Sequence, residues 1–309
     1  MEKLLFITDT LESLDAKKDT SILMMEEAIQ RSYLVYQCQL EDLSIINNSV
    51  AAKTNTISYN NDQLQKNEKK ESFPLNDFKF SFIRKDPPVD EFYINALHLL
   101  GLAQSQGAKI YNDPLSIQSF NEKIFASYFS EFTPETLISA SIDEINNFYN
   151  FRNKKPIIVK PLDGMGGKSI FKIESFDSKD IKILNHLTKD EKTQIVVQEF
   201  MPEVYEGDFR ILVIHGKPFQ KTLARIPQGN SFKGNLAAGG IGIARDITKK
   251  QFKIATEIGT YLMKHGINFA GIDIIGDKLT EINITSPTCA REILNQTQIN
   301  PIHEYFKIL

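Results

Sequence analysis

Residues Gly271 to Pro287 read GIDIIGDKLTEINITSP and form the most informative stretch of the chain. Runs rich in β-branched residues flank Gly276 and Asp277, a pattern that predicts a β-hairpin. Glu281 and Asn283 are two positions apart, so on a strand their side chains share one face. The stretch therefore predicts a hairpin that carries two polar side chains on the same side.

Asp273 reaches that face if the hairpin pairs it with Glu281. This pairing requires a three-residue connection, Gly276 to Lys278, which is a common hairpin loop when it contains glycine. Asp273, Glu281 and Asn283 would then present three oxygen ligands on a rigid surface, as hard divalent cations such as Mg²⁺ prefer. An ordinary hairpin with solvated polar side chains is the alternative interpretation.

The composition is that of an ordinary globular protein. The chain has 309 residues, of which 41% are hydrophobic and 24% are charged, and its length predicts two or three domains. The formal net charge of −3 gives no reason to expect nucleic acid or an anionic membrane as a partner. No run approaches the roughly 18 apolar residues that span a bilayer, and the N-terminal MEKLLFITD turns polar too early for a secretory signal.

Two cysteines, Cys38 and Cys289, are too few and too far apart for a disulfide framework or a zinc site. A reducing, cytoplasmic location is therefore the expectation. No motif assigns a nucleophile's role to either thiol, and we expect both to be structural.

The first third of the chain alternates strand and helix patterns. Strands are expected at Lys3–Asp9, Leu34–Leu40 and Phe78–Arg84, and helices at Asp19–Arg31 and Glu91–Gln106. Such alternation favours a mainly parallel sheet. The polar, lysine-rich segment Asn60–Glu71 is expected to be a mobile surface loop.

The pattern changes beyond residue 122, where we expect the main domain boundary. Strands are expected there at Pro156–Pro161, Ser169–Ile173, Gln194–Phe200 and as a pair within Asp208–Arg225, and helices at Lys179–Leu187 and Thr248–His265. Ile226–Gly242 is rich in glycine and amide residues, and connections of this length are usually lids or linkers. Because a linker makes little sense between two sheet elements of one domain, we expect a lid that closes over the site.

A glycine loop, DGMGGKS, occupies Asp163–Ser169. Its GKS ending resembles a P-loop, but Leu162 stands where the P-loop pattern needs its first glycine, and the following residues alternate as a strand rather than forming a helix. We therefore reject the P-loop interpretation. Gly164, Gly166 and Gly167 can instead let a hairpin backbone approach phosphates closely, although a plain flexible hairpin is the alternative.

Two lysines and one strand end are further candidates for a nucleotide site. Lys160 lies within a run of Ile and Val, where its burial is costly unless it meets an anion, and Lys123 is a second, weaker candidate; surface snorkelling is the alternative for Lys160. Gln198 and Glu199 end a predicted strand, where a hinge could bind adenine through its backbone and ribose through the Glu199 carboxylate. A solvated strand end explains the same residues.

Asp208, Arg210 and Arg225 lie on the predicted strand pair. Asp208 and Arg210 alternate with apolar neighbours, so they share a face. Arginine in such a position can bind a carboxylate or a phosphate in bidentate geometry, and internal Asp–Arg pairing is the alternative.

Seven segments together carry a resemblance to a known family. They are KKDTS (Lys17–Ser21), RKDPP (Arg84–Pro88), NEKIF (Asn121–Phe125), KPLDGMGGKSIF (Lys160–Phe171), DFRILV (Asp208–Val213), ARIPQGNSFKGNLAAGG (Ala224–Gly240) and GIDIIGDKLTEINITSPT (Gly271–Thr288). In this order and spacing the chain resembles a prokaryotic-type glutathione synthetase of the ATP-grasp superfamily. The ARIPQG and EINITSPT motifs separate this family from other ATP-grasp ligases.

The resemblance implies an α/β fold with a mainly parallel N-terminal substrate-binding domain, 1–122, and a two-lobed ATP-grasp domain, 123–309, divided into a lid lobe, about 123–200, and a C-terminal lobe, about 201–309. It implies ATP-dependent ligation of γ-glutamylcysteine to glycine through an acyl phosphate, with Mg²⁺ or Mn²⁺ as cofactor. It also implies a cytoplasmic homotetramer whose partners are these small molecules.

The same resemblance implies residue roles. The residues implied to bind ATP are Lys123, Lys160, Gly164, Gly166, Gly167, Gln198, Glu199 and Asp208, and those implied to bind the metal are Asp273, Glu281 and Asn283. Arg210, Arg225 and Asn235 are implied to be catalytic. The acid substrate is implied to contact Arg210, Arg225, Ser286 and Thr288. Another ATP-grasp carboxylate–amine ligase is the alternative enzyme. A nucleotide-binding regulatory protein without turnover, or a purely structural module, is the alternative outside enzymes.

The chain departs from the family's pattern at three places. Thr8–Thr10 reads TDT where an Asp-Pro pair is expected. Lys233 and Ile241 stand in the predicted lid where arginines are expected, and Ile241 cannot make a charged contact.

Overall fold

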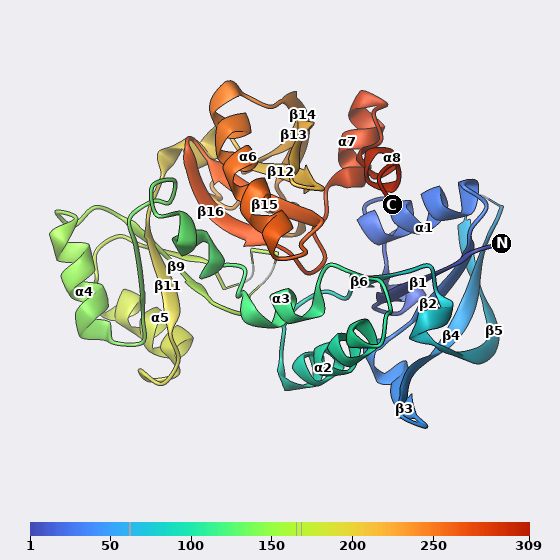
Figure 1. The fold of residues 1–309 in the computed structure, drawn as a ribbon. Helices are drawn as coiled ribbons and strands as arrows, with labels where there is room; N and C mark the ends of the chain where they lie inside the picture. The colour runs from blue at the N-terminus through green and yellow to red at the C-terminus, as the bar shows by residue number, and fades with distance from the viewer. Residues whose placement is uncertain (62, 165, 168) are drawn as a thin grey trace.

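Three β-sheets follow one another along the chain in the computed structural model, which describes residues 1–61, 63–164, 166–167 and 169–309 (Figure 1). Met165 and Lys168 of the DGMGGKS motif lie outside the described residues. The mixture of helices and sheets confirms the predicted α/β class. Short 3₁₀ turns occur at Leu11–Ser13, Leu40–Asp42, Leu75–Asp77, Phe125–Phe129, Pro202–Tyr205 and Leu236–Ala238.

The first sheet contains the predicted parallel strands and an antiparallel extension. Its parallel part is ordered β2-β1-β6-β7 and consists of β1 (Lys3–Thr8), β2 (Leu34–Cys38), β6 (Phe80–Arg84) and β7 (Ile110–Tyr111). β4 (Ser49–Asn60) continues it from β2 in antiparallel pairing, with β3 (Leu43–Ile46) and β5 (Gln63–Pro74) both paired to β4.

The prediction of a loop at Asn60–Glu71 is wrong, because β5 covers most of that segment as a strand. β5 pairs with β4 alone, so its lysines and glutamates lie along an edge. Charged side chains on an edge strand hinder pairing with other chains. The polar composition that suggested a loop is therefore a property of an edge strand. Asp62, within the same segment, lies outside the described residues.

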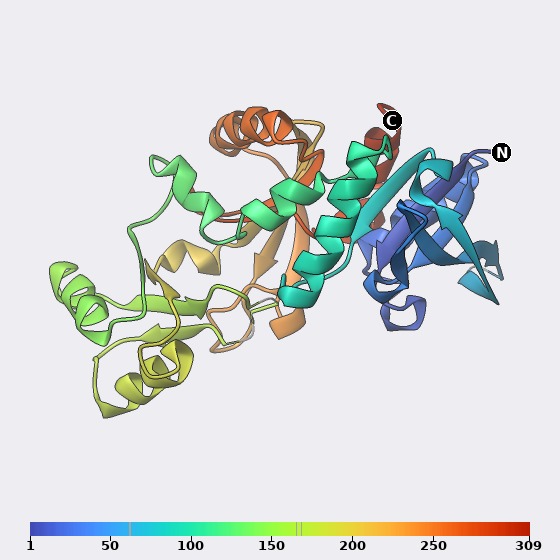
Figure 2. The same cartoon turned by 60° about the horizontal axis from the view of Figure 1, so that its bottom comes forward.

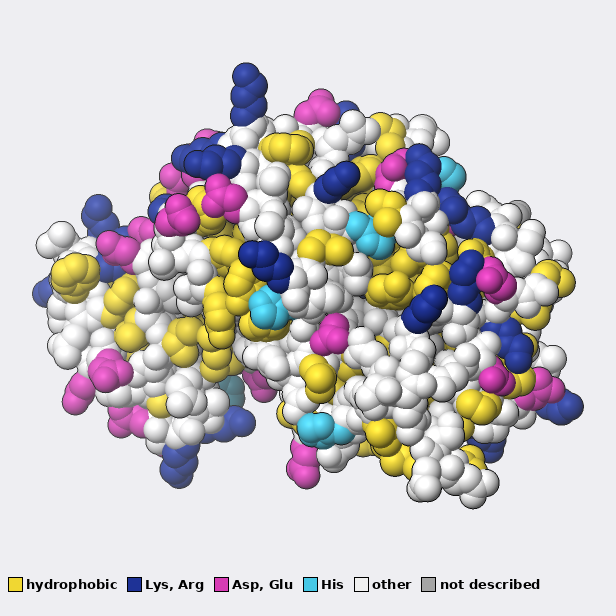
Figure 3. Space-filling view, in the orientation of Figure 1, with side chains coloured by type: hydrophobic (Ala, Val, Ile, Leu, Met, Phe, Trp, Pro, Cys, Tyr) yellow, Lys and Arg dark blue, Asp and Glu magenta, His cyan; other side chains and the backbone are white. Residues whose placement is uncertain are grey.

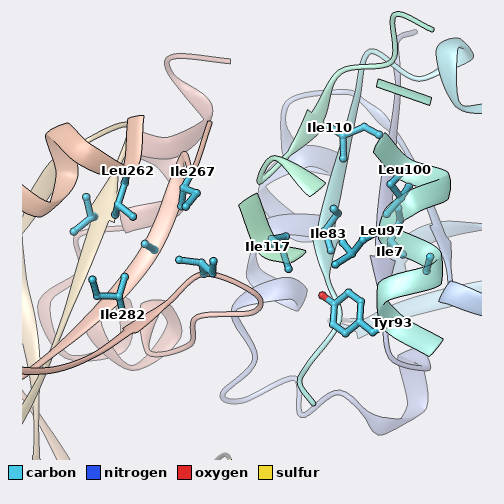
Figure 4. Packing of buried hydrophobic residues seen from close by; sticks show 14 of the residues in the cluster. Ile7, Ile83, Tyr93, Leu97, Leu100, Ile110, Ile117, Leu262, Ile267 and Ile282 are labelled. Atoms are coloured by element: carbon cyan, nitrogen blue, oxygen red, sulfur yellow. The ribbon is translucent and has the colours of Figure 1, made fainter. Parts of the chain in front are cut away.

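Helices cover both faces of the parallel strands. α1 (Thr20–Gln30) is capped by Asp19, which accepts from the Ser21 N–H, and α2 (Glu91–Ser105) is capped by Asp90. Leu4 and Phe6 of β1 pack with α1, whereas the alternate residues of β1 pack with α2. Figure 4 shows the α2 side, where Ile7 and Ile83 meet Tyr93, Leu97 and Leu100. The short helix α3 (Pro114–Ser119) leads away from this sheet.

The second sheet belongs to a lobe with its own hydrophobic core. Its antiparallel order is β10-β9-β11-β8, from β8 (Thr136–Ser139), β9 (Ile157–Pro161), β10 (Phe171–Ile173) and β11 (Ile195–Glu199). α4 (Ile142–Phe151) and α5 (Ser178–Thr188) pack on it through a cluster that includes Ile145, Val159 and Leu184. Figures 1 and 2 show this lobe at the far end of the molecule from the first sheet.

The third sheet is ordered β14-β13-β12-β15-β16 and is antiparallel throughout. Its strands are β12 (Asp208–Ile214), β13 (Lys217–Ile226), β14 (Ile241–Asp246), β15 (Phe269–Ile275) and β16 (Lys278–Asn283). α6 (Lys249–Lys264) covers one face, and Leu262, Ile267 and Ile282 from this region are visible in Figure 4.

The C-terminal helices join the third sheet to the first. α7 (Ala290–Thr297) and α8 (Pro301–Phe306) contact α1, and Phe82 of β6 lies 5.7 Å from Phe306 between ring centroids. Arg31, at the end of α1, donates to the Phe306 carbonyl at 3.1 Å. The first and third sheets therefore share hydrophobic clusters, whereas the second sheet has a separate one.

The surface agrees with the low net charge. On the face shown in Figure 3, basic and acidic side chains are interspersed rather than gathered in a patch of one sign. Within the described ranges, no helix is both long enough and apolar enough to cross a membrane.

Candidate active site

Two adjoining pockets lie between the second and third sheets, and every site residue predicted from the sequence lines one or both of them. Gln198, Glu199 and Asp208 line the first pocket; Lys123, Gly164, Gly166, Gly167, Arg210, Arg225, Asn283, Ser286 and Thr288 line the second; Lys160, Asn235, Asp273 and Glu281 line both. The four shared residues therefore mark where the two pockets meet.

The metal hairpin has the predicted pairing but not the predicted connection. Asp273 lies opposite Glu281, as expected. Ile275 pairs with Lys278, however, so the connection is Gly276 and Asp277 alone, and the three-residue prediction is wrong. A bulge in which Thr280 is the extra residue of β16 restores the Asp273–Glu281 pair.

A buried network of arginines and aspartates occupies the sheet face beside this hairpin. Arg210 donates to Asp273 from Nε at 2.5 Å and from Nη2 at 2.9 Å. Arg225 Nη2 lies 2.6 Å from Asp208 Oδ2 and 2.9 Å from Asp273 Oδ2. The internal Asp–Arg pairing that the sequence left open is therefore present, and it presents both guanidinium groups to the second pocket.

The network shifts the protonation of its members. Burial alone would raise the pKa of Asp273, but Arg210 and Arg225 outweigh it and hold that pKa well below its ordinary value. For Asp208, burial dominates over the pull of Arg225, and its pKa is raised. Among the described residues, Asp208 Oδ1 is a buried oxygen without a hydrogen-bond partner, and Asp208 lines the first pocket. A buried oxygen without a hydrogen-bond partner can accept a hydrogen bond from a ligand.

Two buried lysines line the same pocket as the arginines. Lys123 Nζ lies 3.3 Å from Glu281 Oε1 and donates to the Gly164 carbonyl at 2.5 Å. Lys160 Nζ donates to the Thr280 carbonyl at 3.4 Å, and burial lowers the pKa of Lys160. Together with Arg210 and Arg225 these lysines line the second pocket, and Lys160 lines the first as well. Four cationic side chains in one pocket wall are suited to a polyanion.

The glycine loop and the predicted lid contact each other. Gly166 and Gly167 have φ of +64° and +77°, in the region that favours glycine. A Cβ on Gly167 would lie 2.6 Å from Asn235 Oδ1, and a Cβ on Gly234 would lie 2.4 Å from the Arg225 carbonyl. The connection between β13 and β14 therefore packs tightly over both the glycine loop and the arginine strand.

Family comparisons agree on both halves of the chain. The family model described as "Prokaryotic glutathione synthetase, N-terminal domain" matches residues 2–118, and that of the "Prokaryotic glutathione synthetase, ATP-grasp domain" matches residues 122–298. The glutathione synthetase of Shewanella oneidensis is 42% identical over 95% of this chain and 93% of its own length. The chain belongs to the prokaryotic glutathione synthetase family. The glutathione synthetase of Escherichia coli K12 is 41% identical over 95% of this chain and 93% of its own length.

Solved structures of more distant proteins agree on the fold. The D-cycloserine synthetase DcsG matches with a TM-score of 0.69 at 13% sequence identity. The match covers 98% of this chain and 97% of the DcsG chain. The ATP-grasp ligase PsnB with a minimal precursor has a TM-score of 0.64 at 13% identity, with 100% and 98% coverage. The prediction of an ATP-grasp ligase in the glutathione synthetase family is confirmed, and the protein is an ATP-dependent ligase.

Sequence reasoning missed Arg152, which supports the predicted ribose carboxylate. Arg152 Nη2 donates to Glu199 Oε2 at 2.7 Å, and the same guanidinium contacts Glu135. Gln198, beside it, is buried and donates to Thr136 Oγ1 at 3.1 Å. Nothing in the local sequence around Arg152, at the end of α4, marks a residue that reaches β11.

Glu122 is the second missed residue, although it lies inside the NEKIF motif. Its Oε1 accepts from the Ile284 and Thr285 N–H groups at 2.7 and 2.9 Å and from Thr285 Oγ1 at 2.9 Å. Burial, followed by Glu281, raises the pKa of Glu122. Glu122 thereby fixes the backbone that precedes Ser286, in the wall of the second pocket.

Lys233 and Ile241, which stand where the family's pattern has arginines, lie in different environments. Lys233 lines the first pocket, with Nζ 5.8 Å from the Phe171 ring centroid. Ile241 begins β14 and is 51% exposed.

Cys38 is buried in the first sheet, and Cys289 is buried in the wall of the second pocket, at the start of α7. Burial raises the pKa of both thiols, so neither is activated as a nucleophile.

The predicted metal ligands fit a hard cation by the chemistry of their donors. Glu281 and Asn283 offer a carboxylate and an amide at the pocket wall, whereas Asp273 shares its oxygens with two arginines. Within the part of the chain that is described, no group of three or more His, Cys, Asp or Glu residues is arranged to hold a metal. A cation here would therefore depend on the mixed carboxylate–amide set together with oxygens from water or phosphate.

Proposed function

We propose that this enzyme joins γ-glutamylcysteine to glycine in a Mg²⁺- or Mn²⁺-dependent reaction that converts ATP to ADP and phosphate. The observation that carries the proposal is that Lys123, Lys160, Arg210 and Arg225 all line the second pocket in a member of this family. Phosphoryl transfer needs positioning and cations around developing negative charge more than it needs covalent help from the protein.

The first pocket is proposed to take the nucleoside of ATP. Ile158, Ile170 and Phe232 provide apolar surface for adenine, and the strand end at Gln198 provides backbone groups for its edge. Glu199 would accept from the ribose hydroxyls, oriented by its ion pair with Arg152. The triphosphate would then extend toward Lys160, Lys123 and the glycine loop of Gly164, Gly166 and Gly167.

Asp273, Glu281 and Asn283 would hold the divalent cation. When bound, the cation supplies charge neutralisation for the phosphates. Asp208, the other proposed nucleotide residue, keeps Arg225 in position from the neighbouring strand.

The second pocket is proposed to hold the acid substrate. An oxygen of the cysteinyl carboxylate attacks the γ-phosphorus, the bond from that phosphorus to the β,γ-bridging oxygen breaks, and ADP leaves. The glycine amine then attacks the acyl carbon, phosphate leaves, and the amine loses a proton to solvent. Arg210, Arg225 and Asn235 would meet the carboxylate and phosphoryl oxygens, while Ser286 and Thr288 contact the peptide.

The connection from residue 227 to 240 is proposed to act as the lid. Its close approach to Gly167 and to the Arg225 strand supports this proposal, because both residues line the pocket assigned to the acyl phosphate. Excluding water there protects the intermediate from hydrolysis. The lobe that carries the glycine loop has its own core, so we expect it to move as a body when the site opens.

We also propose a domain division, an oligomeric state and a cellular location for this protein. We assign 1–122 to a substrate-binding domain and 123–309 to the ATP-grasp domain, with lobes of about 123–200 and 201–309. A homotetramer in the cytoplasm, with small-molecule substrates and neither nucleic acid nor membrane as partner, is the state we expect.

The test is ADP release with ATP, Mg²⁺, γ-glutamylcysteine and glycine, omitting each component in turn. The proposal requires release that depends on all four, with one glutathione formed per ADP. Release that persists with another acid or amine would assign the protein to a different ATP-grasp carboxylate–amine ligation. ATP binding without any release would instead indicate a regulatory protein.

A further inference from the structure

Asp86 lines the second pocket, in the part of the wall that comes from the N-terminal third of the chain. It lies two residues beyond the end of β6 and, with Pro87, forms the part of the pocket wall contributed by the N-terminal sheet region. Ligands of parallel sheets commonly bind beyond the carboxyl ends of the strands, and Asp86 lies at such an end. None of the roles given to the other pocket residues uses this carboxylate.

The backbone around Asp86 is firmly held. The Asp86 N–H donates to Asp9 Oδ2 at 3.1 Å, and its carbonyl accepts from Lys85 Nζ at 3.1 Å. The Tyr93 hydroxyl donates to the Lys85 carbonyl at 3.1 Å. These contacts come from the residue after β1, from Lys85 and from α2, so the backbone of Asp86 is held in place beside the sheet and its helix.

The neighbouring cations are engaged elsewhere. Arg84 donates to the Pro287 carbonyl at 2.9 Å and to Ser21 Oγ at 3.1 Å, and Lys85 Nζ lies 2.8 Å from Asp9 Oδ1. Across the described ranges, no lysine, arginine or histidine nitrogen comes within 4.0 Å of the Asp86 carboxylate oxygens. Burial raises the pKa of Asp86, partly offset by a hydrogen bond with Ser286 and by Arg84. The carboxylate thus faces the pocket without a cation of its own.

The second pocket therefore has charged groups from two sheet regions in its wall. Arg210 and Arg225 line it on the third sheet, and Asp86 lines it on the first. Ser286 lines the same pocket and directly follows Thr285, whose N–H is bound by Glu122. A substrate with a carboxylate at one end and an ammonium group at the other would be bound in a single orientation.

We propose that Asp86 binds the α-ammonium group of the glutamyl residue, and so selects γ-glutamyl acids over acids that lack this charge. The inference rests on the proposed function, because it assumes that the cysteinyl carboxylate is at the arginine end. Asp86 then acts as a specificity residue that contacts the substrate far from the reacting atoms. The Asp86 carboxylate would then bind both the ammonium group and, through a hydrogen bond, Ser286.

The test is a comparison of two substrates with wild type and Asp86→Asn. γ-Glutamylcysteine is compared with glutarylcysteine, which lacks only the ammonium group, each with saturating ATP, Mg²⁺ and glycine. For wild type we expect kcat/KM to be lower with glutarylcysteine by about tenfold or more, because the analogue leaves a partly buried charge unpaired. For Asp86→Asn we expect the two substrates to differ by less than about threefold, with KM for ATP unchanged.

Two further variants separate loss of recognition from loss of structure. Asp86→Glu keeps the charge and should retain a preference for γ-glutamylcysteine. Asp77→Asn removes an exposed carboxylate from the same domain and should behave as wild type. If Asp86→Asn does not fold, the Asp86→Glu preference decides the matter, and its absence would overturn the inference.

The outcomes also separate this inference from the proposed function. If wild type forms glutathione but Asp86→Asn rejects glutarylcysteine as strongly as wild type does, Asp86 is not the ammonium site while the ligase assignment remains. Wild type that uses both acids equally well would overturn the inference in the same way. Failure to form any peptide from γ-glutamylcysteine would overturn the proposed function itself.

Discussion

Asp273 and Glu281 face each other across β15 and β16 because β16 contains one residue more than a regular hairpin would need. Without the bulge at Thr280, a two-residue connection would pair Asp273 with Thr280 and leave Glu281 out of register. The pair also lies between two sets of cations, since Arg210 contacts Asp273 and Lys123 contacts Glu281. Of the two carboxylates, Glu281 is the more exposed and the more available to a metal.

We predict that Glu281→Gln lowers the Mg²⁺-dependent rate by at least about tenfold, because it removes the charge of one proposed metal ligand. Initial rates over a range of Mg²⁺ concentrations, with ATP fixed, measure the effect. Glu257→Gln, an exposed change on α6, is the control. A variant that keeps near wild-type activity at limiting Mg²⁺ would show that Glu281 is not a metal ligand.

The sequence was sufficient where period-2 alternation and glycine spacing decide the structure. It predicted that Asp208 shares a face with Arg210, because strand geometry alone sets that relation. Asp273 pairs with Glu281 as expected, but through a bulge rather than through the three-residue connection that the prediction required. The sequence could not predict the bulge at Thr280, since a bulge and a longer loop explain the same pairing. The polar β5 was mistaken for a loop because edge strands and loops share a charged composition.

Contacts between residues that are far apart in the sequence could not be predicted either. Arg84 reaches the Pro287 carbonyl across 203 positions of sequence, and Glu122 reaches Thr285 across 163. No local pattern records such contacts, because they depend on how the first and third sheets pack together. The motifs nevertheless contained both residues, so the resemblance identified the segments without revealing what each side chain does in them.

Gly167→Ala should uncouple ATP cleavage from peptide formation. The added methyl group would lie 2.6 Å from Asn235 Oδ1 at a residue with φ of +77°, so the lid or the glycine loop must shift. We expect ADP formed per glutathione to rise above one, because water then reaches the acyl phosphate. Parallel ADP and glutathione assays measure the ratio.

Gly229→Ala provides a matched control for Gly167→Ala. Gly229 also has a positive φ, +59°, but a Cβ there would meet no described atom within 4 Å. Both substitutions strain the backbone, and only one creates a contact between lid and loop. Equal ratios of ADP to glutathione in the two variants would rule out the Gly167–Asn235 contact as the cause.

Glu199→Gln should reduce the preference for ATP over 2′-deoxy-ATP. The Glu199 carboxylate, held by Arg152 at 2.7 Å, is the proposed acceptor for ribose hydroxyls, and a charged acceptor binds a hydroxyl more strongly than an amide oxygen does. We expect the ratio of kcat/KM for the two nucleotides to fall by about threefold to tenfold. An unchanged ratio would exclude Glu199 from ribose binding. Glu203→Gln, a change to an exposed acid on the following turn, is the control.

Glu122→Gln should change how stability depends on pH. Burial and Glu281 raise the pKa of Glu122 in the folded protein, so the folded state binds its proton more tightly than the unfolded chain does. For such a carboxyl, the free energy of unfolding falls as pH rises above the unfolded pKa of about 4.3, and the loss is complete above the folded pKa. Glutamine keeps an oxygen acceptor for Ile284 and Thr285 and does not titrate.

Urea unfolding of wild type and Glu122→Gln at several pH values, from the unfolded pKa upward, measures this difference. The stability of Glu122→Gln relative to wild type should increase with pH through that window and then level off. Glu122→Ala should be less stable than Glu122→Gln at every pH by about 1–3 kcal/mol, because it leaves buried donors of Ile284 and Thr285 unpaired. A constant offset between wild type and Glu122→Gln across the whole range would mean that the Glu122 carboxyl has the same pKa in the folded and unfolded protein.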